Sequence, residues 1–168
     1  MGPPGSGKTT LIHKLLKSAP DGEPVALWSV GNAHDSAKLP SRRPRRMLLE
    51  AEDNAGLDRP AIGDFLAHAG YVGTTVAVVD GLAFAGHGPQ TDGGPLREAA
   101  VVFVNRAQGL TCGERAELLR AVWAVNPRAS VLVDPVDGLN LWRLLDAATP
   151  APPATGSAQE DKKPIYGR

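Results

Sequence analysis

Continuous apolar runs and helical apolar stripes alternate along the chain. Short runs rich in β-branched residues are typical of buried strands, and they predict strands at residues 24–30, 47–53, 72–81, 99–105 and 130–134. Apolar residues spaced three and four apart predict helices at residues 8–18, 60–69, 113–126 and 139–148. Polar and glycine-rich stretches between these elements predict two long loops, at residues 31–46 and 82–95.

This alternation predicts the α/β fold class. Strands that are apolar on both faces fit a mostly parallel β-sheet with helices on both faces, built from right-handed strand–helix–strand units. We expect one domain over residues 1–148, because the composition shifts to small and polar residues from Thr149 onward. That shift predicts a disordered C-terminal tail over residues 149–168. In the helix at 113–126 the apolar stripe is expected to comprise Ala116, Leu119, Val122 and Trp123.

A phosphate-binding loop opens the chain. The stretch GPPGSGKT, from Gly2 to Thr9, fits the pattern G-x-x-x-x-G-K-[ST] in full, and a helix follows it as the pattern requires. Glycines let backbone N–H groups surround a phosphate, Lys8 would reach the β- and γ-phosphates, and Thr9 would ligate Mg²⁺. The nucleotide-binding residues predicted here are Gly2, Pro3, Pro4, Gly5, Ser6, Gly7, Lys8, Thr9 and Thr10.

The loop begins at residue 2, whereas a P-loop motif is ordinarily strand, loop and helix in that order. We therefore expect a P-loop NTPase-like sheet that lacks the usual first strand and is recognisable from residue 8 onward. Either the true start lies upstream, or the sheet closes over the gap. In the second case the phosphate site is expected to be less rigid than its residues suggest.

A second motif follows the strand at 47–53. Asp53 and Gly56 form D-x-x-G, where a nucleotide hydrolase places a carboxylate near Mg²⁺ and a glycine whose N–H reaches the γ-phosphate. We predict Asp53 as a Mg²⁺ ligand, with Glu50 and Glu52 as nearby alternatives and an acidic turn as the plainer interpretation. Asp35, in the loop at 31–46, could approach Mg²⁺ or the attacking water, or be an ordinary solvated aspartate.

A third motif, Asn105-Arg106-Ala107-Gln108, follows the strand at 99–105. A guanine site has N-K-x-D in this place, so Asn105 would bridge loop segments and the stem of Arg106 would pack on the base. Gln108 stands where a carboxylate is expected, and its neutral carbonyl is a weaker acceptor for the base. We predict a vestigial base-binding segment here, with an ordinary strand-to-loop turn as the alternative.

Composition narrows the classes of partner. Lys+Arg and Asp+Glu are equal at 18 each, so the overall charge favours neither nucleic acid nor a membrane surface as partner. The single cysteine, Cys112, rules out a disulfide within the chain, and a cytoplasmic location is expected. No apolar run approaches the length of a membrane span.

Several motifs together resemble the nucleotide-binding domain of CobW-type GTPases, relatives of the UreG and HypB nickel-insertion proteins. The matching stretches are GSGKTTLI, DNAGLDRP, VVDG, FVNRAQGL and NPRAS, in the family's order over about residues 2–147. The resemblance implies Mg²⁺-dependent GTP hydrolysis coupled to metal delivery or cofactor maturation, with a metalloprotein client or self-association. The family's C-x-C-C metal motif has no counterpart between residues 31 and 46, and Arg106 and Gln108 replace Lys and Asp.

Three functions remain open from the sequence. The first is an Mg²⁺-dependent hydrolase of GTP or ATP, with Lys8, Asp53 and Asp35 as the catalytic residues. The second is a nucleotide-binding or regulatory module without significant turnover. The third is a P-loop kinase for a small metabolite, in which residues 86–97 would form the lid and Arg97 is the single arginine.

Overall fold

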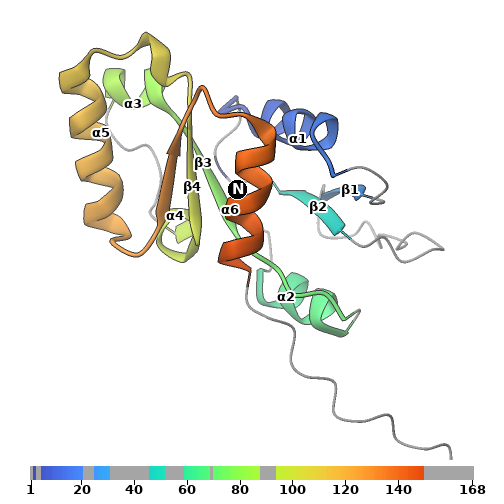
Figure 1. The fold of residues 1–168 in the computed structure, drawn as a ribbon. Coiled ribbons are helices and arrows are strands. Elements are labelled where there is room, and N and C mark those ends of the chain that lie inside the picture. Colours follow the sequence, from blue (N-terminus) through green and yellow to red (C-terminus); the bar gives the residue numbers. More distant parts are fainter. Residues whose placement is uncertain are drawn as a thin grey trace, which may run out of the picture.

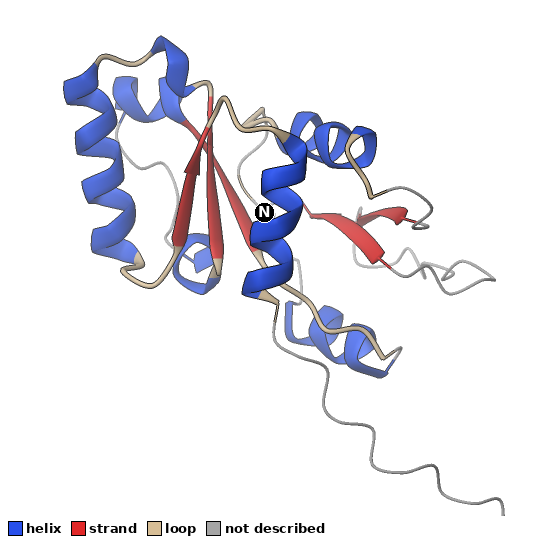
Figure 2. Cartoon of the chain, viewed as in Figure 1, coloured by secondary structure: helices blue, strands red, loops and turns tan. Residues whose placement is uncertain are grey.

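A computed structural model describes residues 2, 5–20, 25–30, 46–51, 59–68, 70–87 and 94–149 (Figure 1). Helices and strands alternate through most of this part of the chain (Figure 2). The elements in chain order are α1 (Lys8–Lys17), β1 (Val25–Val30), β2 (Arg46–Ala51), α2 (Arg59–His68), β3 (Val76–Asp80), α3 (Gly81–His87), α4 (Gly94–Glu98), β4 (Val101–Asn105), the 3-10 turn η1 (Ala107–Gly109), α5 (Cys112–Val125), β5 (Ser130–Val133) and α6 (Gly138–Ala148).

Every strand pair in the described residues is parallel, which confirms the predicted α/β class. β4 lies between β3 and β5, with Val76 opposite Val101 and Val101 opposite Ser130. β1 and β2 form a separate two-stranded sheet, so the described strands make two sheets where one was expected. The division falls between β2 and β3.

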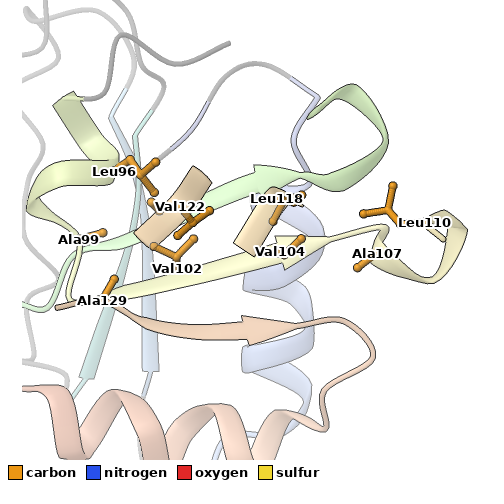
Figure 3. Packing of buried hydrophobic residues seen from close by; sticks show 10 residues of the cluster. Leu96, Ala99, Val102, Val104, Ala107, Leu110, Leu118, Val122 and Ala129 are labelled. Carbon is orange, nitrogen blue, oxygen red and sulfur yellow. The ribbon is translucent and has the colours of Figure 1, made fainter. Parts of the chain in front are cut away.

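Helices cover both faces of the three-stranded sheet (Figure 1). Alternate residues of β4 enter two different cores, as the two-residue period of a strand requires. Val102 and Val104 pack into the core beneath α5, which Figure 3 shows from close by. Val101 and Phe103 pack into the core beneath α1 and α6. These four side chains are at most 3% exposed, so β4 is the centre of the hydrophobic interior.

The loop predicted at 82–95 is wrong in part, because α3 and α4 occupy its two ends. The carboxylate of Asp80 explains α3: its Oδ1 accepts hydrogen bonds from the backbone N–H groups of Leu82 and Ala83, at 3.1 and 3.3 Å. Such a bond satisfies N–H groups at a helix start that have no partner within the helix. Pro95 fits the first turn of α4 because a proline lacks only an N–H that the helix does not use there.

The buried side of α5 also differs from the expectation. Leu118 and Val122 are buried at 0% and 2% exposure, whereas Trp123 is 46% exposed. Leu118 and Val122 are four residues apart and therefore lie one above the other on the same face. The helix turns this row toward the sheet, and Trp123 faces away from the core.

Contacts from α6 tie the two-stranded sheet to the rest of the molecule. The guanidinium of Arg46, at the start of β2, pairs with the carboxylate of Asp146 and lies 4.9 Å from the ring centre of Trp142. The indole Nε1 of Trp142 donates to the carbonyl of Leu15 in α1, at 3.0 Å in a buried position.

Within the part of the chain that the structure describes, no helix is long and apolar enough to cross a membrane.

Candidate phosphate-binding site

The glycine loop makes close backbone contacts that a side chain would block. Gly7 has φ of 96°, a conformation that favours glycine, and a Cβ there would lie 2.0 Å from Nδ2 of Asn105. A Cβ on Gly2 would lie 2.4 Å from the carbonyl oxygen of Val78 in β3. The loop therefore lies against the three-stranded sheet, beside the middle of β3 and the end of β4.

Helix α1 begins directly after this loop and presents its N-terminus there. Its N-cap residue is Gly7, which makes no side-chain capping bond, and its first turn contains no acidic residue. The first N–H groups of a helix have no partner within the helix, and the helix dipole favours negative charge beside them. The start of α1 is therefore suited to an anion such as a phosphate.

Two polar side chains of the loop are buried. Lys8 is 8% exposed, and its Nζ donates to the carbonyl of Gly2 at 2.8 Å. Ser6 is 1% exposed, and its hydroxyl has no hydrogen-bond partner among the described residues. Buried polar groups in proteins are nearly always hydrogen-bonded, so an unpartnered hydroxyl inside this loop indicates a place for a polar ligand or water.

Thr9 contacts a carboxylate from the other sheet. Its hydroxyl donates to Oε1 of Glu50, on β2, at 2.6 Å. A threonine hydroxyl beside a carboxylate is the kind of oxygen pair that Mg²⁺ prefers. The residue found beside Thr9 is thus Glu50, which the sequence offered only as an alternative to Asp53.

The end of β4 holds the loop from the other side. Asn105 donates through Nδ2 to the carbonyl of Ser6 at 3.1 Å. Arg106 donates through a terminal guanidinium nitrogen to the carbonyl of Gly5 at 3.1 Å. The guanidinium also pairs with the carboxylate of Asp80, at the end of β3. Asp80 was not predicted as a site residue, and its position at a strand end beside Gly81 is the signal that could have identified it.

The described site therefore joins residues that are distant in the sequence. It contains Gly2, Gly5, Ser6, Gly7, Lys8, Thr9, Asn105 and Arg106, together with Glu50 and Asp80. Thr10 lies exposed in the first turn of α1, and Gln108 lies exposed in η1. Five predicted residues lie outside the described part of the chain: Pro3, Pro4, Asp35, Asp53 and Gly56.

Other metal-binding groups do not gather in the described residues, where no cluster of three His, Cys, Asp or Glu side chains occurs. Cys112 is exposed at the first position of α5. The pair Thr9 and Glu50 remains the described place where a hydroxyl and a carboxylate oxygen meet beside the phosphate loop.

Comparison with known proteins supports the fold. No protein-family model matches the sequence, and no curated protein matches it. Among solved structures, the chain is similar to the hydrogenase maturation factor HypB from Archaeoglobus fulgidus, with 17% sequence identity and a TM-score of 0.57. The match covers 85% of this chain and 83% of that chain. The resemblance stated from the motifs is therefore confirmed at the level of the fold.

Proposed function

We propose that this protein binds nucleoside triphosphates through its phosphate loop and hydrolyses GTP or ATP with Mg²⁺, as a divergent relative of the CobW, UreG and HypB proteins. The observation that carries the proposal is the glycine loop at the start of α1, with the buried Lys8 inside it and the Ser6 hydroxyl, which has no hydrogen-bond partner among the described residues. The likeness in fold to a hydrogenase maturation factor supports it.

The residues of the loop would act by positioning and by electrostatics. On binding, Lys8 Nζ would exchange the carbonyl of Gly2 for oxygens of the β- and γ-phosphates, where its charge stabilises the transferring phosphoryl group. The N–H groups at the start of α1 would hold the same phosphates. Attack of water on the γ-phosphorus breaks the bond to the β-phosphate oxygen and releases inorganic phosphate.

Thr9 and Glu50 fit a magnesium site, because their oxygens already lie within hydrogen-bond distance. Mg²⁺ held by these two residues would supply positive charge to offset the charge that develops on the phosphates. Thr9 would hold the ion through its hydroxyl and Glu50 through its carboxylate. Asp53 and Asp35 stay predictions for further oxygen ligands or for orienting the attacking water.

Base recognition is proposed to be weak. The exposed Gln108 offers an uncharged acceptor where a guanine site uses a carboxylate. Arg106 holds a loop carbonyl and a carboxylate through its guanidinium. We therefore expect GTP and ATP to be bound with similar affinity, chiefly through their phosphates.

We also propose a role in metal-centre maturation. The similar solved protein is a hydrogenase maturation factor, and the sequence motifs indicate the same group of proteins. In this chain, such a role would involve binding to a client metalloprotein or self-association.

A regulatory module without turnover is the second candidate. The neutral Gln108 and the bond that turns Lys8 back onto its own loop favour it.

The position of Arg97 argues against the kinase alternative. That residue lines a pocket with Ala100 and Ser130, at the amino ends of β4 and β5, whereas the phosphate loop lies at the carboxyl end of β4.

The test is nucleotide binding and phosphate release with Lys8→Ala, and with Lys17→Ala as the matched control. Both lysines belong to α1, but Lys17 is exposed in the last turn. We expect Lys8→Ala to reduce Mg²⁺-dependent phosphate release by about 100-fold, the cost typical of removing one donor to a developing charge. Lys17→Ala should behave as the wild type.

The outcomes separate the candidates. Nucleotide binding by the wild-type protein without phosphate release would favour the regulatory module. If the protein binds neither GTP nor ATP, both the hydrolase and the regulatory module are refuted. Phosphate transfer to an added small metabolite, in place of release to water, would favour the kinase.

A further inference from the structure

Two adjacent residues at the end of β4 hold two adjacent carbonyls of the phosphate loop. Asn105 binds the carbonyl of Ser6, and Arg106 binds the carbonyl of Gly5, each at 3.1 Å. In a trans peptide the C=O of one residue and the N–H of the next point in opposite directions. Fixing the Gly5 and Ser6 carbonyls toward β4 therefore turns the N–H groups of Ser6 and Gly7 away from β4.

Arg106 adopts a backbone conformation that indicates a constrained position. Its φ is 57° and its ψ 26°, and among the described residues it is the one non-glycine with positive φ. Non-glycine residues in this region cost free energy and persist where the surrounding structure demands them. Here the conformation accompanies the bond to the loop carbonyl and the ion pair with Asp80.

Asp80 uses both carboxylate oxygens. One oxygen pairs with Arg106, and the other accepts from the N–H groups of Leu82 and Ala83 at the start of α3. The side chain of Asp80 is 11% exposed, against 45% for Arg106. The carboxylate is therefore held by α3 and can in turn hold the guanidinium in place.

We propose that Asp80 and Arg106 form a latch that orients the phosphate loop for its ligand. Asp80 fixes the guanidinium of Arg106, Arg106 fixes the Gly5 carbonyl, and the Ser6 N–H is thereby aimed at the phosphates. Both are positioning residues, and Arg106 acts through geometry because Asp80 offsets its charge. The inference rests on the proposed function for its effect on nucleotide binding, whereas the effect on the loop itself is independent of it.

The decisive variant is Asp80→Asn. Asparagine caps helices as well as aspartate does, so the start of α3 is retained while the ion pair is lost. Removing a negative charge beside an anion site would by itself strengthen nucleotide binding. The latch makes the opposite prediction: GTP binding should weaken by about tenfold, since loss of a charge-assisted contact is worth about that factor.

Arg106→Asn tests the second half of the latch. Asparagine tolerates positive φ, so this variant keeps the backbone conformation but is too short to reach Gly5. The double variant Asp80→Asn with Arg106→Asn should bind GTP no more weakly than Arg106→Asn alone, because the two residues act in series. Arg120→Ala, exposed on α5, is the control and should bind as the wild type does.

Hydrogen exchange of the backbone amides in residues 5–8 provides a readout without nucleotide. Both single variants should speed this exchange several-fold, and Arg120→Ala should not. If the loop exchanges faster but the wild-type protein binds no nucleotide, the latch stands and the proposed function fails. Unchanged exchange in both variants, or tighter GTP binding by Asp80→Asn, would overturn the latch.

Discussion

The side chain of Asn105 fills the space where a Cβ on Gly7 would lie, and its amide holds the carbonyl of the preceding Ser6. One residue at the end of β4 thus sets the path of two residues in the phosphate loop. Because Gly7 is also the N-cap of α1, the direction in which α1 begins depends on this contact.

Gly7→Ala is expected to lower the free energy of unfolding by about 1–3 kcal/mol, because alanine is strained at φ of 96°. Its methyl group would also displace Asn105. Urea denaturation measures the change. Gly113→Ala is the matched control: a Cβ on Gly113, in the first turn of α5, would meet nothing within 4 Å. It should be neutral or stabilise by up to about 1 kcal/mol. Equal effects of both substitutions would contradict the close approach.

The sequence indicates residues of the candidate site more easily than the contacts between them. The pattern G-x-x-x-x-G-K-[ST] identified Lys8 and Thr9 because its spacing is fixed within one loop and one helix turn. The partners of Thr9 and Arg106 come from other strands. The distance between each residue and its partner depends on strand register and on where β2 and β3 end. Glu50 was therefore only an alternative, and Asp80 was missed.

At the scale of elements, α5 begins with a reciprocal pair of hydrogen bonds between its N-cap residue and its third residue. The Thr111 hydroxyl accepts from the N–H of Glu114 at 3.3 Å, and the Glu114 carboxylate accepts from the N–H of Thr111 at 2.8 Å. The hydroxyl of Thr111 also donates to that carboxylate at 2.7 Å. These bonds form a capping box, which begins the helix at Cys112.

The capping box has a consequence for acid stability. The hydroxyl and then the backbone N–H of Thr111 lower the pKa of Glu114 below its usual value of 4.5. A lowered pKa in the folded state adds stability that is fully present above the unfolded value and is lost as pH falls through the folded value. We therefore expect wild-type protein to be more stable than Glu114→Gln at neutral pH, and this advantage to be lost as pH falls from the usual pKa through the lowered pKa of the folded state.

Thermal unfolding of both proteins across that pH range measures the effect. Glutamine can still accept the backbone bond, so the comparison isolates the charge. A wild-type advantage that stays constant into strong acid would exclude Glu114 as its source. In a Thr111→Val background, which removes the hydroxyl, the pH-dependent difference should become smaller.

The elements that sequence reasoning missed are the short ones. Strands and long helices have enough residues to show a period, and all nine were predicted to within a few residues of their bounds. Helix α3 contains glycine at both Gly81 and Gly86 and shows no apolar stripe. Its start depends on the Asp80 carboxylate, a local hydrogen bond that periodicity does not report.

At the scale of the whole molecule, a ligand that binds the folded state must stabilise it. GTP with Mg²⁺, at about 100 times its dissociation constant, should raise the free energy of unfolding by about 2.7 kcal/mol. Differential scanning calorimetry with and without nucleotide measures this. Lys8→Ala should lose most of the increase, and a nucleotide-induced stabilisation that is equal in both proteins would place the ligand elsewhere.

The parallel architecture followed from the sequence because the strands are apolar on both faces, which requires helices on both sides. The division of the strands into two sheets did not follow. The apolar pattern within a strand does not say which strand is its neighbour, and the described contacts of β2 with α6 include those of the Arg46 side chain with Asp146 and Trp142.

That division places the two halves of the candidate site on different sheets. The phosphate loop is bound to the end of β4 and lies beside β3, whereas Glu50 belongs to β2. A triphosphate held by Lys8, with its ion held by Thr9 and Glu50, would act as a cross-brace between the sheets. Since no β2–β3 ladder links the sheets in the described residues, the Thr9–Glu50 hydrogen bond joins β2 to the start of α1 through side chains and not through backbone pairing.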